Sequence, residues 1–168
     1  MILHGNNTRV KLSSNILSEV RRVVLAVLAP FNSDIVSSLL RRSRDVSEYV
    51  RKHLYLVVME KLPLRKLTQQ QRVSLLADGL HDRSETVRQN CIRMLGAWLK
   101  QCSDSSAKLL SYLGVVANQD IAALSAFRLL ENEQLDCNDI DIHNLSNEQA
   151  LFVRVFCQFL QQKTVLKT

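Results

Sequence analysis

A short pattern of residues recurs three times in the chain. A serine and a glutamate precede a Val-Arg pair at 18–22, 47–51 and 84–88, and the three valines are spaced 30 and 37 residues apart. Apolar residues follow each valine four and eight positions later. Periods of this length are typical of solenoids, in which each helix pair buries its apolar face only against its neighbours. The repeat therefore favours an array of stacked helices.

Helical periodicity extends over nearly the whole sequence. Apolar residues recur three or four positions apart, as from Val87 through Cys91 and Leu95 to Trp98, and no stretch alternates with period two long enough to predict a strand. Four glycines and two prolines are too few for the turns of a many-stranded sandwich or barrel. The sequence predicts an all-α fold, an α-solenoid of about four HEAT-like antiparallel helix pairs cut at both ends. We expect helices at 15–29, 33–42, 46–61, 68–80, 83–101, 105–117, 120–131 and 147–162.

Side chains that can cap a helix mark several of these starts. Thr68 and Ser146 each precede a glutamine by three residues, which is the spacing of a capping box. Asp45 and Asp82 each precede a glutamate by three residues and mark two further starts. Short polar or proline-containing connections separate the helices, as expected for antiparallel neighbours.

The repeat phase gives the domain organisation. We expect an irregular amino-terminal segment at 1–14, a HEAT-repeat array at 15–163 with an acidic loop at 132–145, and a carboxyl-terminal tail at 164–168. The expected helix at 15–29 resembles the second helix of a repeat, but no first helix precedes it. The expected helix at 147–162 resembles the first helix of a repeat, but no second helix follows it. Because natural terminal repeats are capped by polar faces, we expect a piece of a longer array.

Composition and charge narrow the class of protein. The longest apolar run, from Val23 to Phe31, is too short to cross a bilayer, and the four cysteines form no CxxC pair. These features predict a soluble intracellular protein. Residues 1–100 hold 17 Lys and Arg against 8 Asp and Glu, whereas residues 101–168 hold 5 against 8. This asymmetry suggests contact with a polyanion on one side of the molecule, although solvated helix faces produce such counts too.

Two sequence stretches resemble a known family. The D-x-x-x-x-V-R start, present at 45–51 and 82–88, resembles the HEAT-repeat signature. The run R-S-R-D-V-S-E-Y-V-R-K at 42–52, the motifs Q-R-V and G-L-H-D-R-S within 71–84, and Trp98-Leu99 are similar to the HEAT-repeat G subunit of condensin I. The resemblance extends from about Val20 to Gln161.

This resemblance implies a non-catalytic scaffold without a cofactor. Its expected partners are the kleisin subunit of condensin, the ATPase pair of structural-maintenance-of-chromosomes proteins, and double-stranded DNA, with no membrane or small-molecule partner. Its expected location is the nucleus and cytoplasm, and the chromosomes in mitosis. Lys and Arg on phosphates hold DNA without reading its bases, which suits chromosome condensation. The alternative is a HEAT-repeat adaptor of the transport or phosphatase-scaffold type that binds only proteins, because solenoids share one architecture across functions.

Basic side chains gather at the expected helix connections, where several repeats could present charge along one surface. The candidate DNA contacts are Arg41, Arg42, Arg44, Arg51, Lys52, Lys61, Arg65 and Lys66. Arginines at the repeat-equivalent position, Arg51 among them, instead suit a structural ladder with the aspartates that start the next repeat. The candidate residues of this ladder are Arg21, Asp45, Asp82 and Arg88.

The acidic stretch that follows the expected helix at 120–131 lacks the pattern of a calcium-binding loop. Counted from Asp136, an EF-hand requires glycine at the sixth place and glutamate at the twelfth, where the chain has Asp141 and Asn147. The four histidines form no HExxH motif. The sequence therefore predicts no metal site and no catalytic residues, and a surface loop that could contact a partner.

Overall fold

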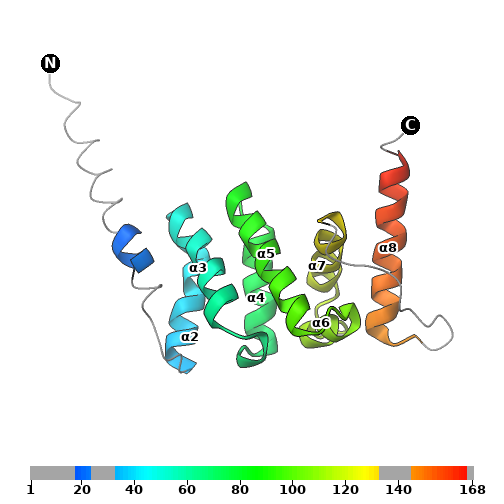
Figure 1. The fold of residues 1–168 in the computed structure, drawn as a ribbon, viewed down its shortest axis with the longest axis horizontal. Helices are drawn as coiled ribbons and strands as arrows, with labels where there is room; N and C mark the ends of the chain where they lie inside the picture. The colour runs from blue at the N-terminus through cyan, green and yellow to red at the C-terminus, as the bar shows by residue number, and fades with distance from the viewer. Residues whose placement is uncertain (1–17, 24–32, 133–144, 166–168) are drawn as a thin grey trace, which may run out of the picture.

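The computed structural model describes residues 18–23, 33–132 and 145–165, and these are helical apart from their connections. The helices stand side by side in a row from the amino-terminal to the carboxyl-terminal end (Figure 1). This arrangement confirms the predicted all-α solenoid. After a helical segment at 18–23, the elements are α2 (Ser33–Leu40), η1 (Arg41–Arg44), α3 (Glu48–Lys61), η2 (Leu64–Lys66), α4 (Gln69–Leu80), α5 (Glu85–Gln101), α6 (Ser106–Leu113), α7 (Gln119–Glu131) and α8 (Asn147–Val165).

Both predicted capping boxes form. The Thr68 side chain accepts a hydrogen bond from the Gln71 backbone N–H, and the Gln71 side chain accepts one from the Thr68 N–H. Ser146 makes the same two bonds with the glutamine three residues later. At α3 and α5 the N-cap position is the serine two residues after the predicted aspartate, so these helices begin at Glu48 and Glu85. The Ser84 side chain accepts the Val87 N–H, whereas the Ser47 side chain makes no capping bond.

Two predicted helices are shorter than expected. The helix expected over 33–42 ends at Leu40, and the chain continues as the 3-10 turn η1. The helix expected over 105–117 ends at Leu113, because Gly114 adopts a left-handed conformation (φ 68°) and its N–H bonds to the carbonyls of Leu110 and Ser111. Glycine makes this ending possible because it carries no side chain that would clash at positive φ.

Regular antiparallel pairing does not continue to the end of the chain. α2 with α3 and α4 with α5 are successive antiparallel neighbours joined by short connections. The amino-terminal residues Gln119 of α7 and Asn147 of α8 line one pocket, and Phe127 and Gln158, further along the same helices, line another. α7 and α8 therefore run in the same direction, which corrects the predicted alternation in this part of the array.

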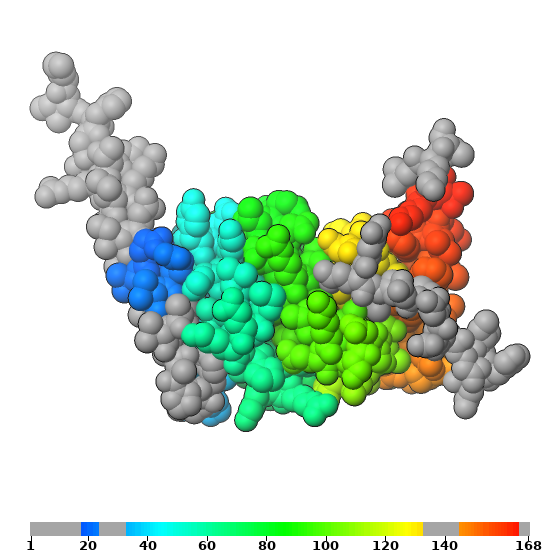
Figure 2. All heavy atoms as spheres, in the orientation of Figure 1, coloured from blue at the N-terminus to red at the C-terminus, as the bar shows by residue number. Residues whose placement is uncertain are grey.

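A continuous apolar core joins the described helices. Tyr55 of α3 and Trp98 of α5 are fully enclosed, and Phe152 brings α8 into the same core. Gly79 allows a close approach between elements, since a Cβ there would lie 2.5 Å from both the Cys91 Sγ and the Tyr55 hydroxyl oxygen. Figure 2 shows that the side chains of α3, α5 and α6 form one unbroken surface on the face toward the viewer.

Parts of the predicted domain organisation lie outside the described residues. These are the segment 1–14, positions 15–17 and 24–32, which include most of the helix expected at 15–29, positions 133–144 of the acidic loop, and positions 166–168 of the tail. α8 continues to Val165, two residues beyond the predicted end of the array. No helix in the described part of the chain combines the length and the apolarity needed to cross a membrane.

Candidate nucleic-acid interface

Two arginines of the repeat pattern bind aspartates that precede the next helix of the same type. Arg51 donates to both carboxylate oxygens of Asp82, from Nε at 2.7 Å and from Nη2 at 3.0 Å. Arg21 donates from Nη2 to one carboxylate oxygen of Asp45 at 3.1 Å, and its Nε lies 3.1 Å from the other oxygen without a hydrogen bond. Each aspartate also accepts a backbone N–H from the serine two residues later, so it positions the start of its helix. These contacts tie neighbouring repeats together.

Burial strengthens the Arg51–Asp82 pair. The side chains of Arg51 and Asp82 are each 6% exposed. Burial alone would raise the pKa of Asp82, but the hydrogen bonds from Arg51 and from the Ser84 N–H outweigh it and hold that pKa below its ordinary value. Arg51 has no free surface to offer to DNA. We therefore remove it from the candidate DNA contacts and assign it to the ladder.

Arg88 occupies the equivalent position in α5 but reaches no aspartate of a following repeat. Its Nη1 donates to the Asp82 carbonyl, and its Nη2 pairs with Glu85 of the same helix. The inter-repeat role predicted for Arg88 is therefore not met among the described residues, because its contacts stay inside its own repeat.

The candidate cations of the η1 turn mostly have carboxylate partners. Arg42 lies 3.6 Å from Asp45, and Arg44 donates from Nε to both oxygens of Asp78 at 3.1 Å. Arg41 is exposed and makes no ion pair with any described residue. At this turn the charge of Arg41 is not compensated by a described carboxylate, and the same holds for the exposed Arg83, whose Nη2 lies 3.5 Å from the Val46 carbonyl.

The remaining candidates do not share a surface with that turn. Lys61, Arg65 and Lys66 lie at or after the end of α3, whereas η1 precedes its start. A helix of 14 residues is about 21 Å long. The eight predicted contacts are thus divided between opposite edges of the row of helices, at the two ends of α3, and Lys52, within α3, is half-buried. This corrects the expectation of one continuous basic surface.

The η2 end gathers further cations that the sequence did not single out. The Leu64 N–H donates to the side-chain oxygen of Gln101 at 2.9 Å, which brings η2 against the end of α5. Burial raises the pKa of the Cys102 thiol, and the positive charges of Lys108, Arg65 and Arg72 act in the opposite direction, so these cations lie close to it. Only the tertiary fold reveals this grouping, because the residues come from η2, α4 and α6.

We define the basic end by its exposed cations that form no ion pair with any described carboxylate. The basic end comprises Arg65, Lys66, Lys100 and Lys108. Lys100 and Lys108 were not among the predicted contacts, because single cations at helix ends are common on solvated surfaces.

Arg72 lies behind this end. It is 8% exposed, its guanidinium lies 5.1 Å from the centre of the Tyr112 ring, and burial lowers its pKa. The stacking contact between α4 and α6 offsets part of the cost of burying this cation. Arg72 therefore ties α4 to α6.

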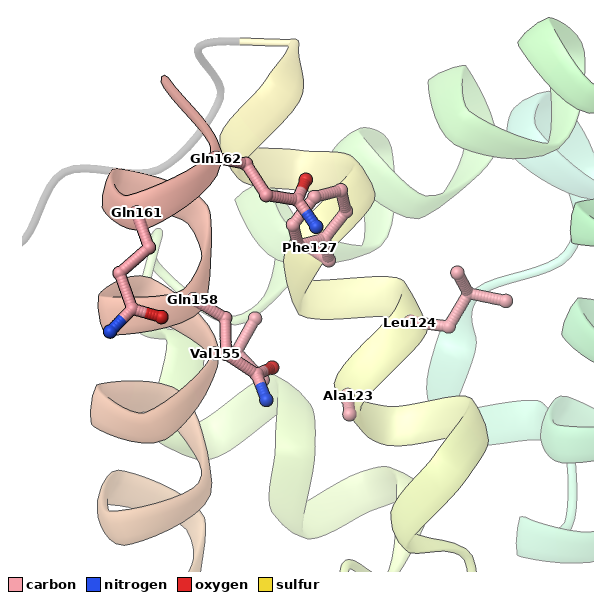
Figure 3. Close-up of a pocket in the computed structure, with 7 residues that line it drawn as sticks. All are labelled: Ala123, Leu124, Phe127, Val155, Gln158, Gln161 and Gln162. Atoms are coloured by element: carbon pink, nitrogen blue, oxygen red, sulfur yellow. The ribbon is translucent and has the colours of Figure 1, made fainter. Parts of the chain in front are cut away.

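A mostly apolar hollow lies near the carboxyl-terminal end of the described row. It measures about 850 Å³ and lies between α7 and α8, where Phe127 faces Val155, Gln158 and Gln162 (Figure 3). Within the described residues no group of three or more His, Cys, Asp or Glu side chains could hold a metal ion. The tested acidic stretch lies largely outside those residues.

The fold and the two arginine–aspartate pairs define the chain as a HEAT-like α-solenoid, a class in which stacked repeats form extended binding surfaces. No protein-family model matches the chain. It is 31% identical over 174 residues to condensin complex subunit 3 of Homo sapiens, which covers 96% of this chain and 17% of that protein. It is 34% identical over 158 residues to the Xenopus laevis subunit, which covers 86% of this chain and 15% of that protein.

A solved structure agrees with these relatives. The crystal structure of the S. pombe condensin Cnd3–Cnd2 subcomplex matches with a TM-score of 0.80 and 30% identity, covering 89% of this chain and 22% of that chain. The chain belongs to the family of the condensin HEAT-repeat subunit. It spans about one sixth of the length of the curated relatives it matches.

Proposed function

We propose that this chain forms part of a non-catalytic condensin scaffold that binds the kleisin subunit and holds double-stranded DNA without reading its sequence. Family membership supports the scaffold role, and the related solved structure contains Cnd3 together with Cnd2, which supports a kleisin partner. In this role the scaffold acts beside the ATPase pair of the complex, on mitotic chromosomes, with no cofactor.

The basic end is the observation that carries the DNA proposal. Its four exposed cations form no ion pair with described carboxylates, so their charge remains available to phosphates. By contrast, Arg42 and Arg44 of η1 already have aspartate partners. Contacts of lysine and arginine with phosphates position a duplex without sequence information. The proposed DNA surface is therefore the η2 end, with Lys61 beside it, rather than the η1 turn.

A salt series tests this assignment. Replacing Arg65, Lys66 and Lys108 together with glutamine should weaken binding to a labelled DNA duplex, measured by fluorescence anisotropy. The slope of log affinity against log salt should fall by about 0.9 for each lost phosphate contact. The matched control replaces Arg83, Arg93 and Arg154 with glutamine and should keep the wild-type slope. Equal slopes for the two triple variants would contradict the assignment.

A separate experiment tests the kleisin partner. The chain should co-purify with the kleisin subunit when the two are expressed together. Recovery of transport or phosphatase components in its place would favour the protein-only adaptor, which the shared solenoid architecture also permits.

A further inference from the structure

Arg51 and Arg21 meet the aspartate of the next repeat with the same edge of the guanidinium, formed by Nε and Nη2. Arg51 donates from Nη1 to the carbonyl of Asp45 in its own repeat, while Nε and Nη2 grip the carboxylate of Asp82 in the next. Arg21 presents the same Nε and Nη2 pair to Asp45. A planar guanidinium is suited to this bidentate contact, which a lysine cannot reproduce. Two successive rungs thus place a carboxylate at the same position on the arginine.

Arg88 makes the backbone contact inside its own repeat, but among the described residues it binds no aspartate of a following repeat. Its Nη1 donates to the Asp82 carbonyl, as Nη1 of Arg51 does to Asp45. The next long helix, α7, runs opposite to α5, because its last residues, Arg128 and Glu131, lie beside the first turn of α5. No start of a following helix therefore brings an aspartate to Arg88 in the described part of the chain.

A pocket of about 390 Å³ occupies this position. Two cations, Arg88 and Arg128, line it together with the carboxylates of Asp82, Glu85 and Glu131, and each cation pairs with a glutamate three residues away on its own helix. Those partners, Glu85 and Glu131, have side chains 61% and 37% exposed. Such exposed pairs are weak and exchange readily with solvent. An incoming carboxylate can therefore replace Glu85 on Arg88 without breaking a buried contact.

We propose that the Arg88 pocket binds an aspartate or glutamate carboxylate of a partner polypeptide, in the position that Asp82 holds on Arg51. The repeat equivalence of the two arginines, the pocket beside Arg88 and the second cation Arg128 each support this acidic partner. The site lies at the start of α5, at the opposite end of that helix from Lys100 of the basic end, so it is independent of the proposed DNA contact.

The chain itself supplies a probe. A labelled peptide that copies residues 79–92 carries Asp82 ahead of the same helix start, and a second peptide has D82N. The protein should bind the aspartate peptide about tenfold more tightly than the asparagine peptide, because hydrogen bonds to a charged carboxylate are the stronger ones. The variants R88Q and R88K should both lose this preference, E85Q should strengthen binding of the aspartate peptide, and R93Q on the exposed face of α5 should change nothing.

Three results would overturn the proposal. The first is equal or absent binding of the two peptides, and the second is a preference that persists in R88Q. The third is a carboxylate supplied by the chain itself. In that case the triple variant D136N/D139N/D141N would lower the melting temperature in the wild-type background and leave it unchanged in R88Q.

Discussion

At the scale of single residues, Arg51 shows how one side chain can fit two different predictions. Its type and position suit a phosphate contact, and its place in the repeat suits a ladder. The structure assigns it to the ladder, because its guanidinium is enclosed and takes both oxygens of Asp82. A buried charge without its partner is strongly unfavourable, so the pair can be tested by removing one member.

Replacing Asp82 with alanine should lower the free energy of unfolding by about 3 kcal/mol, because Arg51 would remain buried without a carboxylate. Urea denaturation monitored by circular dichroism measures the change. The control is E131A, which removes the more exposed partner of Arg128 and should cost less than about 1 kcal/mol. Similar losses in the two variants would show that the Arg51–Asp82 pair is not enclosed in solution.

The same pair predicts how stability depends on pH. The pKa of Asp82 is lower in the folded protein than in the unfolded chain, where an aspartate has a pKa of about 3.9. The unfolded state therefore binds more protons between these two values, and the stabilisation from Asp82 is complete above about pH 5 and is lost as the pH falls through the folded value. Urea denaturation from pH 6 to 3 should show a smaller acid loss in D82N than in the wild type.

At the scale of elements, helix boundaries depend on short local signals. The Thr68–Gln71 and Ser146–Gln149 boxes form as their spacing predicts. The ends at Leu40 and Leu113 were placed too late, because helical periodicity continues past the points where the backbone changes. Gly114 was the available signal for the second of these ends, since glycine commonly follows the last helical residue.

The capping box of α4 should make a measurable contribution. Replacing Thr68 with alanine leaves the N–H of Gln71 without its acceptor and should lower the free energy of unfolding by about 1 kcal/mol. The control T164A changes an exposed threonine in the last turn of α8, whose hydroxyl donates only to the Leu160 carbonyl. Urea denaturation should show a smaller loss for T164A, and the opposite order would exclude a stabilising cap at Thr68.

At the scale of the whole molecule, stability should vary along the row of helices. α3 and α5 are enclosed by neighbours on both sides and hold fully buried residues such as Tyr55 and Trp98, whereas α8 stands at the end of the described row. Solenoid repeats contact only their neighbours, so an end helix can open without the centre.

Hydrogen exchange measured by mass spectrometry can test this gradient. Amides of α3 and α5 should exchange most slowly, and those of α8 should exchange sooner. The variant F152A, which removes a buried α8 side chain, should speed exchange in α8 more than in α3. Uniform protection along the chain would instead indicate that the whole molecule opens as one unit.

The sequence by itself determined the helical class, the repeat and three of the predicted ladder residues, Arg21, Asp45 and Asp82. Each depends on spacing along one chain: apolar positions three or four apart, and an aspartate six residues before an arginine at both 45–51 and 82–88. Local spacing survives in any fold that buries the same faces. The family resemblance rests on these same stretches, and the relatives confirm it.

Only the tertiary structure decided which cations lack a carboxylate partner, and so are available to phosphates, and where these cations gather. Arg44 binds Asp78 and Arg51 binds Asp82, each more than thirty residues away along the chain, and the sequence alone does not show such pairs. Helix α3 separates the η1 and η2 turns by about its own length, while folding brings Lys108 to the η2 end. The direction of α7, set by its packing beside α5, likewise leaves Arg88 without the aspartate that its repeat pattern predicts. Charge availability depends on contacts between distant segments, and spacing along the chain does not encode them.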